Sequence, residues 1–164
     1  MPSKILLCKT QEGKLLHMAD LAFNKRANFD YEILEKFEAG IELKGFEVKA
    51  IRHARLNLSG AYVIIRGGEA YLINADLPPY QPMNTPEGYD SKRTRRLLLN
   101  KKEIRELVGR VNESGLTIVP INCYTKGTLI KLKIGLGKPK KKHDKREAIK
   151  KRDTQREISR NLGR

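Results

Sequence analysis

The stretch that decides the fold is residues 61–74, AYVIIRGGEAYLIN, because it encodes two strands and the turn between them. Residues 61–66 and 69–74 are rich in the β-branched and aromatic side chains that strands favour. Gly67 and Gly68 lie between them, and glycine accepts the positive φ that a two-residue hairpin turn requires. These features predict an antiparallel β-hairpin.

A second hairpin is predicted from residues 116–124 and 129–135, with its turn at residues 126–127. Pro120 has no backbone N–H, so we expect it at a sheet edge or a bulge. A further strand is expected near residues 15–22. The chain therefore contains several strands that short connections can pair in antiparallel fashion.

Three short helices are predicted beside these strands. Asp30 is a favourable N-cap, and Ile33, Leu34 and Phe37 share one helical face, which would place Glu38 at a helix C-terminal end. Residues 47–55 predict the second helix. The third helix would begin with a capping box at Asn100 and Glu103, continue with a stripe of apolar residues and end at Gly115; the stripe is Ile104, Leu107, Val108 and Val111.

The predicted elements indicate an α+β fold that is mainly antiparallel β. A small OB-like closed β-barrel with about three short flanking helices accounts for them, because closure removes the edges of the sheet. We expect residues 1–14 to be a weakly ordered N-terminus, residues 15–136 to form the barrel, and residues 137–164 to form a basic tail that is disordered when free. Nothing indicates an apolar dimer face, so we expect a monomer.

The tail carries most of the excess charge. Residues 137–164 contain 12 Lys and Arg against 4 Asp and Glu, which is +8 of the formal +15 of the 164-residue chain. Apolar residues are too few there to offset the entropy of ordering the segment. A pI of about 9.9 makes nucleic acid the expected partner, because phosphates attract Lys and Arg.

Three basic segments are candidates for contact with RNA. In residues 129–135, alternation places Lys131 and Lys133 on one strand face, where they can contact successive phosphates. The segment Asn24-Lys25-Arg26 is expected to be a polar, basic loop, and Arg93, Arg95 and Arg96 offer guanidinium groups. Each pattern also fits a solvated surface, and the carboxylate of Glu38 either pairs with a neighbouring cation or accepts from amino and hydroxyl groups of RNA.

Residues 76–92 contain four of the seven prolines and are expected to form a long loop. Tyr80 and Tyr89 within it are candidates for stacking on a single base. Because aromatic residues make up only 6% of the chain, shape and backbone recognition of structured RNA fits better than stacking along a single strand.

An enzyme is not expected. Cys8 and Cys123 are far apart, the histidines are not clustered, and no phosphate-binding loop or nucleophile motif is present. We therefore expect no metal and no cofactor. No run of residues reaches transmembrane length, so we expect a soluble, cytoplasmic protein.

A series of motifs resembles the SsrA-binding protein family, also called small protein B, in the order in which they occur. They are NKRA at 24–27, FEAGI at 37–41, GFEVK at 45–49, LNLS at 56–59, GEAYL at 68–72, RTRRLLL at 93–99, KLKIG at 131–135 and HDKR at 143–146. The resemblance spans about residues 24–153 and is far more specific than any one motif.

The resemblance implies a factor for trans-translation, which binds the tRNA-like domain of transfer-messenger RNA and delivers this RNA to stalled ribosomes. It associates Glu38, Leu98, Lys131 and the segment Asn24-Lys25-Arg26 with that RNA. Together with the basic residues considered above, the expected binding residues are Asn24, Lys25, Arg26, Glu38, Arg93, Leu98, Lys131 and Lys133.

For the tail, the resemblance implies entry into the empty messenger channel as a helix, with residues at the decoding centre and on 16S rRNA. The residues concerned are Lys138, Lys140, Lys141, Lys142, His143, Asp144, Lys145 and Arg146. Alanyl-tRNA synthetase and elongation factor Tu are further partners reached through the RNA. A ribosomal or ribosome-assembly protein with a basic tail is the alternative, and an RNA-modifying enzyme is a third possibility.

Overall fold

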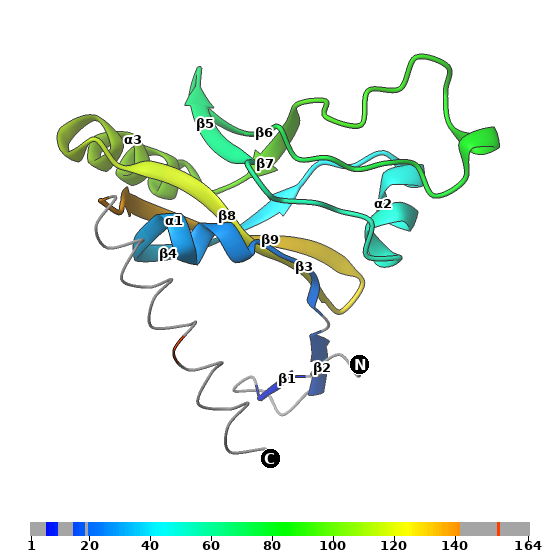
Figure 1. Cartoon of the computed structure of the whole chain (residues 1–164), viewed down its shortest axis with the longest axis horizontal. Helices are drawn as coiled ribbons and strands as arrows, with labels where there is room; N and C mark the ends of the chain where they lie inside the picture. Colours follow the sequence, from blue (N-terminus) through cyan, green and yellow to red (C-terminus); the bar gives the residue numbers. More distant parts are fainter. Residues whose placement is uncertain (1–5, 10–14, 19, 142–153, 155–164) are drawn as a thin grey trace.

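The structure, a computed structural model, describes residues 6–9, 15–18, 20–141 and 154. In this part of the chain the main sheet has seven strands: β3 (Asp20–Phe23), β4 (Tyr31–Ile41), β5 (Tyr62–Arg66), β6 (Glu69–Ile73), β7 (Arg95–Leu98), β8 (Thr117–Lys126) and β9 (Leu129–Pro139). Their spatial order is β3-β8-β5-β6-β7-β4-β9, and β8 also pairs with β9, so six of them close into a ring (Figure 1). All these pairings are antiparallel.

The core lies inside this ring. Strand alternation directs one face of each strand inward, and the strand residues Leu72, Leu132, Ile134 and Leu136 are fully buried there. The predicted fold class, a mainly antiparallel closed sheet with helices beside it, is confirmed.

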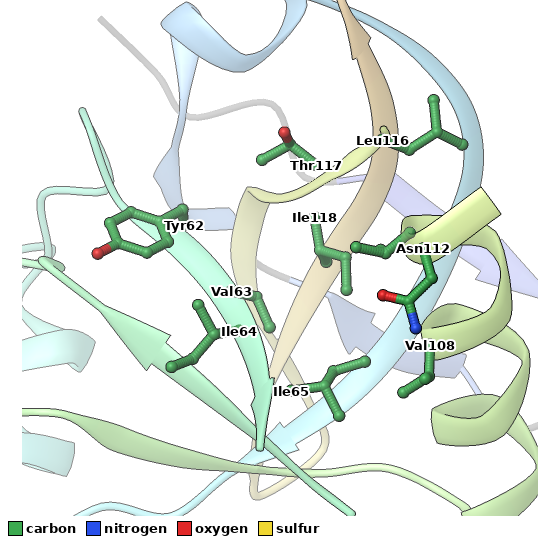
Figure 2. A pocket seen from close by; sticks show the side chains of 10 residues that line it. Tyr62, Val63, Ile64, Ile65, Val108, Asn112, Leu116, Thr117 and Ile118 are labelled. Atoms are coloured by element: carbon green, nitrogen blue, oxygen red, sulfur yellow. The ribbon is translucent and has the colours of Figure 1, made fainter. Parts of the chain in front are cut away.

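The ring is held most weakly between β5 and β8, where Val63 and Ile118 form the one registered pair. Next to this seam, an apolar hollow of about 420 Å³ lies between β5 and α3 (Lys101–Ser114). In Figure 2, Val108 projects from the helix toward this hollow, and Ile65 projects toward it from the strand.

The other helices are α1 (Lys25–Asp30), α2 (Gly45–Arg52) and a single 3-10 turn, η1 (Pro82–Asn84), within the proline-rich loop. The predictions of α2 and α3 are confirmed, with α2 placed about two residues earlier than expected. At the start of α3, the carboxylate of Glu103 accepts a hydrogen bond from the Asn100 N–H at 2.9 Å, and Gly115 ends the helix with a φ of +58°.

The predicted helix after Asp30 is wrong, because residues 31–41 form β4. Along this strand, more buried and more exposed side chains alternate. Leu34, which the predicted helix would have placed on its buried face, is 52% exposed. Nine registered pairs with β9 and two with β7 supply hydrogen bonds that outweigh the local helical spacing. Glu38 therefore lies in a strand and not at a helix C-terminal end.

Both predicted hairpins are present. The first turns at Gly67 and Gly68, with φ of +61° and +75°. The second turns at Gly127 and Thr128, one residue later than predicted, because Lys126 is registered with Leu129. The strand register shifts between Pro120 and Asn122, which is the bulge expected from the proline.

Before the ring, residues 6–9 form β1 (Leu6–Lys9), which pairs with β2 (Leu15–Met18) in a separate two-stranded ribbon. The weak order expected of residues 1–14 stays a prediction. The predicted boundary at residue 136 falls inside β9, which continues to Pro139. None of the helices in the described part of the chain is both long and apolar enough to cross a membrane.

Candidate nucleic-acid interface

Three adjacent strands, β4, β9 and β8, bring Glu38 and two of the predicted lysines together. Glu38 on β4 is registered with Lys133 on β9, and Gly40 is registered with Lys131. On the other side of β9, Lys131 is registered with Tyr124 of β8. As predicted from the alternation, Lys131 and Lys133 lie on the outer face of the ring while Leu132 lies in its core.

The Glu38 carboxylate is the centre of this cluster. It accepts a short hydrogen bond from the Tyr124 hydroxyl, and its Oε1 lies 3.2 Å from Lys126 Nζ and 3.7 Å from Lys131 Nζ. The Tyr124 hydrogen bond lowers the pKa of Glu38, against the effect of partial burial, and the two ammonium groups lower it further. Glu38 is therefore an anion held between cations, with an exposed carboxylate that can still accept hydrogen bonds.

Tyr124 contributes in a second way. Burial, followed by the neighbouring Glu38 carboxylate, raises the pKa of the Tyr124 hydroxyl, so the hydroxyl stays protonated and donates. Its ring lies beneath Lys133, with Nζ 5.8 Å from the ring centroid. Neither Tyr124 nor Lys126 was a sequence-based candidate. The register with Lys131 would have indicated Tyr124, but register is a property of the folded sheet.

Leu98 is on β7, which pairs with β4 along the edge opposite to β9 and its lysines. It is 54% exposed and is registered with Gly40, where an added Cβ would come within 3.2 Å of the Leu98 side chain. Leu98 and Lys131 line one hollow of about 300 Å³, together with Leu43, Val48 and the tip of the β8–β9 hairpin. The fold thus groups Glu38, Leu98 and Lys131 around Gly40, and we name this surface the Glu38 surface.

The segment Asn24-Lys25-Arg26 is elsewhere. It begins α1, which lies near Tyr31 at the start of β4, seven residues or about 23 Å along the strand from Glu38. Asn24 is buried and caps α1: its Oδ1 accepts from the N–H groups of Arg26 and Ala27, and its Nδ2 donates to the Pro120 carbonyl at 2.9 Å. The exposed charges of this segment are those of Lys25 and Arg26.

Arg93 and Arg95 bind a carboxylate within the protein. The side chain of Glu47 on α2 is fully buried and pairs with Arg93 Nη2 at 2.5 Å and Arg95 Nη2 at 2.9 Å. Arg95 is itself fully buried, so the prediction that it contacts phosphate is wrong. Tyr89, a predicted stacking residue, also donates its hydroxyl to Glu47 and is held inside this network.

Two tail candidates belong to the folded body. Lys138 is an exposed residue of β9 and is registered with Glu32. Lys140 follows β9 and is tied to α1, because its Nζ donates to the Asn28 carbonyl at 2.9 Å and its N–H donates to Asp30. Lys141 is exposed. The remaining tail candidates, Lys142, His143, Asp144, Lys145 and Arg146, lie outside the described residues.

Comparison with known proteins agrees with this geometry. The family model described as SmpB protein matches residues 21–164. This chain belongs to the SmpB family. The SsrA-binding protein of Microcystis aeruginosa is 47% identical over 94% of this chain and 98% of its own length, and that of Mesoplasma florum is 54% identical over 83% and 91%.

A solved SmpB structure is also similar. A chain of "tmRNA-SmpB: a journey to the center of the bacterial ribosome" is 40% identical, with a TM-score of 0.63 over 80% of this chain and 95% of that chain. The SmpB match begins within β3, so it includes the whole ring and the Glu38 surface, whereas the β1–β2 ribbon precedes it. The resemblance inferred from the motifs is confirmed.

Proposed function

We propose that this SmpB family member is an RNA-binding factor for trans-translation, which binds the tRNA-like domain of transfer-messenger RNA and delivers it to stalled ribosomes. The observation that carries the proposal is the grouping of Glu38, Leu98 and Lys131 around Gly40. The names of the matched relatives, SsrA-binding protein, and the tmRNA-SmpB structure support it, and they do not favour a structural ribosomal protein.

The Glu38 surface offers RNA three kinds of contact. The Lys131 and Lys133 ammonium groups neutralise phosphates, and the counterions that the phosphates then release add to the affinity. The Glu38 carboxylate accepts from base amino groups or ribose hydroxyls, and Leu98 gives an apolar contact with a base or sugar. Because Tyr124 and two lysines hold the carboxylate, its orientation is fixed before RNA arrives.

The tail is assigned a separate role. In this proposal, the chain leaves the ring through the segment that contains Lys138, Lys140 and Lys141. Residues 142–146 then reach the 16S rRNA of the decoding centre through the empty messenger channel. The ordering cost of a cationic segment can be offset where rRNA phosphates surround it. Making and breaking of bonds is left to the ribosome, so we infer no enzymatic activity. The protein acts in the cytoplasm as a monomer. It meets alanyl-tRNA synthetase and elongation factor Tu through the RNA.

The test is a charge-matched pair of variants of the full chain. Lys131→Ala removes one cation from the Glu38 surface, and Lys102→Ala removes one exposed cation from α3. We expect Lys131→Ala to weaken binding to transfer-messenger RNA by about tenfold or more and Lys102→Ala to change it by less than about twofold, in a filter-binding assay at 150 mM salt. Equal effects of both variants would contradict the proposal, because they would show that only total charge matters.

A further inference from the structure

A second aromatic and cationic patch lies at the C-terminal end of α2. The rings of His53 and Tyr80 are stacked face to face, with centroids 4.0 Å apart and an interplanar angle of 3°. Lys49 Nζ and Arg55 Cζ lie 5.4 Å and 5.1 Å from the Tyr80 ring centroid. With Arg52 on the same helix, these five residues form what we call the α2 patch.

In this stack Tyr80 is half-buried and packs against the core, whereas His53 is exposed. Tyr80 covers one face of the His53 ring, so the opposite face is the one on which a base would stack. The His53 ring is therefore a flat platform that Tyr80 supports from behind.

The cations of the α2 patch are not neutralised by acids. Lys49 Nζ donates to Gln81 at 3.1 Å, Arg52 Nη2 donates to the Thr128 carbonyl at 3.3 Å, and Arg55 Nη1 donates to the Pro79 carbonyl at 3.0 Å. Within the described residues, none of the three forms an ion pair with a carboxylate. Each keeps a full positive charge and free N–H donors for a phosphate.

The α2 patch is continuous with the Glu38 surface. The hydrogen bond from Arg52 ends on Thr128, in the turn between β8 and β9, and Thr128 and Val48 line the same hollow as Lys131. Figure 1 shows α2 beside the tip of this hairpin. An RNA bound at the hollow would therefore meet the α2 patch next.

We propose that the α2 patch is a stacking site for one unpaired nucleotide of the RNA bound at the Glu38 surface. The base stacks on the opposite face of His53, and the flanking phosphates are contacted by Lys49, Arg52 and Arg55. The inference rests on the proposed function and extends it by a contact of different chemistry. Stacking needs no particular base, since every base has a π-face, so the site takes any nucleotide that the RNA leaves unpaired.

The first test measures affinity of the full chain for transfer-messenger RNA. We expect His53→Ala to weaken binding at least about fivefold, because a stacked base contributes binding energy of that order, and His53→Phe to stay within about twofold of the unmodified protein. If His53→Ala binds transfer-messenger RNA as tightly as the unmodified protein while Lys131→Ala binds it more weakly, the stacking proposal for the α2 patch is wrong and the proposed function stands. If the unmodified chain does not prefer transfer-messenger RNA to bulk tRNA, the proposed function and this extension both fail.

A second test observes the stack directly. The chain contains no tryptophan, so His53→Trp introduces a single tryptophan at the platform, which can be excited selectively in the presence of the six tyrosines. We expect its fluorescence to be quenched as transfer-messenger RNA saturates the protein, while Val108→Trp, at an exposed position on α3, stays unquenched. Saturated binding without quenching of the His53→Trp variant would refute the stacking contact even if affinity falls in His53→Ala.

Discussion

Replacement of Glu47 by glutamine should destabilise the fold far more than loss of a surface charge. The two carboxylate oxygens of Glu47 accept hydrogen bonds from Lys44 N–H, Tyr89, Arg93 and Arg95, at 2.5–3.1 Å. Glu47→Gln keeps the size of the side chain but replaces one acceptor oxygen by an NH₂ group that faces donors. The fully buried Arg95 guanidinium is then left without its counter-charge.

The size of the effect follows from the pKa of Glu47. Burial by itself would raise this pKa, but the hydrogen bonds from Arg93 and the Lys44 N–H and the charge of Arg95 outweigh it and lower the pKa from 4.5 to about 2. Each unit corresponds to about 1.4 kcal/mol, so the ionised carboxylate contributes about 3 kcal/mol. Loss of one partner from a buried ion pair costs about 3 to 5 kcal/mol, which agrees.

The sign of the pH dependence is fixed by the lowered pKa. In the unfolded chain Glu47 is protonated below about pH 4.5, whereas in the folded protein it stays ionised down to about pH 2. The contribution of about 3 kcal/mol is therefore complete above pH 4.5 and disappears as the pH falls to 2. Glu47→Gln lacks this part of the pH dependence.

Urea unfolding at pH 7 and at pH 3 measures both effects. With an m-value of about 2 kcal/mol/M, we expect the midpoint of Glu47→Gln at pH 7 to fall by about 1.5 M or more. Glu69→Gln is the control, because its pair with Arg96 at 2.5 Å is largely exposed and should cost less than about 1 kcal/mol. Equal losses in the two variants, or an unchanged pH dependence in Glu47→Gln, would refute the reasoning.

The packing also predicts the effects of substitutions at Asn24, Gly135 and Gly109 and the reactivity of Cys123. Asn24→Ala should cost about 2 kcal/mol in urea unfolding, because the side chain caps α1 and binds the β8 bulge; a cost under about 0.5 kcal/mol would contradict this role. Gly135→Ala should cost about 1 to 3 kcal/mol, because the new Cβ lies 2.8 Å from a buried isoleucine, whereas Gly109→Ala on α3 meets nothing within 4 Å and should stabilise by about 1 kcal/mol. Cys123, the pKa of which burial raises to about 12, should react with a thiol reagent at pH 8 only on unfolding; rapid modification of the folded chain, with the other cysteine replaced, would show that the ring opens.

The sequence predicted turns and ends of elements better than it predicted β4. Gly67, Gly68 and Gly115 have positive φ for local reasons, and local chemistry is visible in a sequence. The spacing of Ile33, Leu34 and Phe37 is equally local, but it competes with eleven registered pairs to β7 and β9, whose partners are 56 to 108 residues away along the chain. These distant pairs determine that residues 31–41 form a strand, and the sequence of the segment itself does not indicate them.

The candidate site shows the same division. Alternation placed Lys131 and Lys133 on one face correctly, because it depends only on the strand containing them. The role of Arg95 was misjudged because its partner, Glu47, lies 48 residues earlier, and a basic residue is expected at the surface by default. RNA contact by Arg93, which pairs with Glu47 but is partly exposed, stays a prediction. Leu98 became a candidate only through the family resemblance, and its proximity to Glu38 was not predictable because that proximity arises from the ring.

Strand β9 has a mechanical consequence. It carries Lys131 near its start and ends at Pro139, eight residues or about 26 Å away, where Lys140 is tied to α1. Since β9 is paired on both sides, this distance behaves as the length of a rigid strut. If RNA is held at the Lys131 end, as proposed, this strut sets a fixed separation of about 26 Å between that RNA and the point at which the chain leaves the sheet.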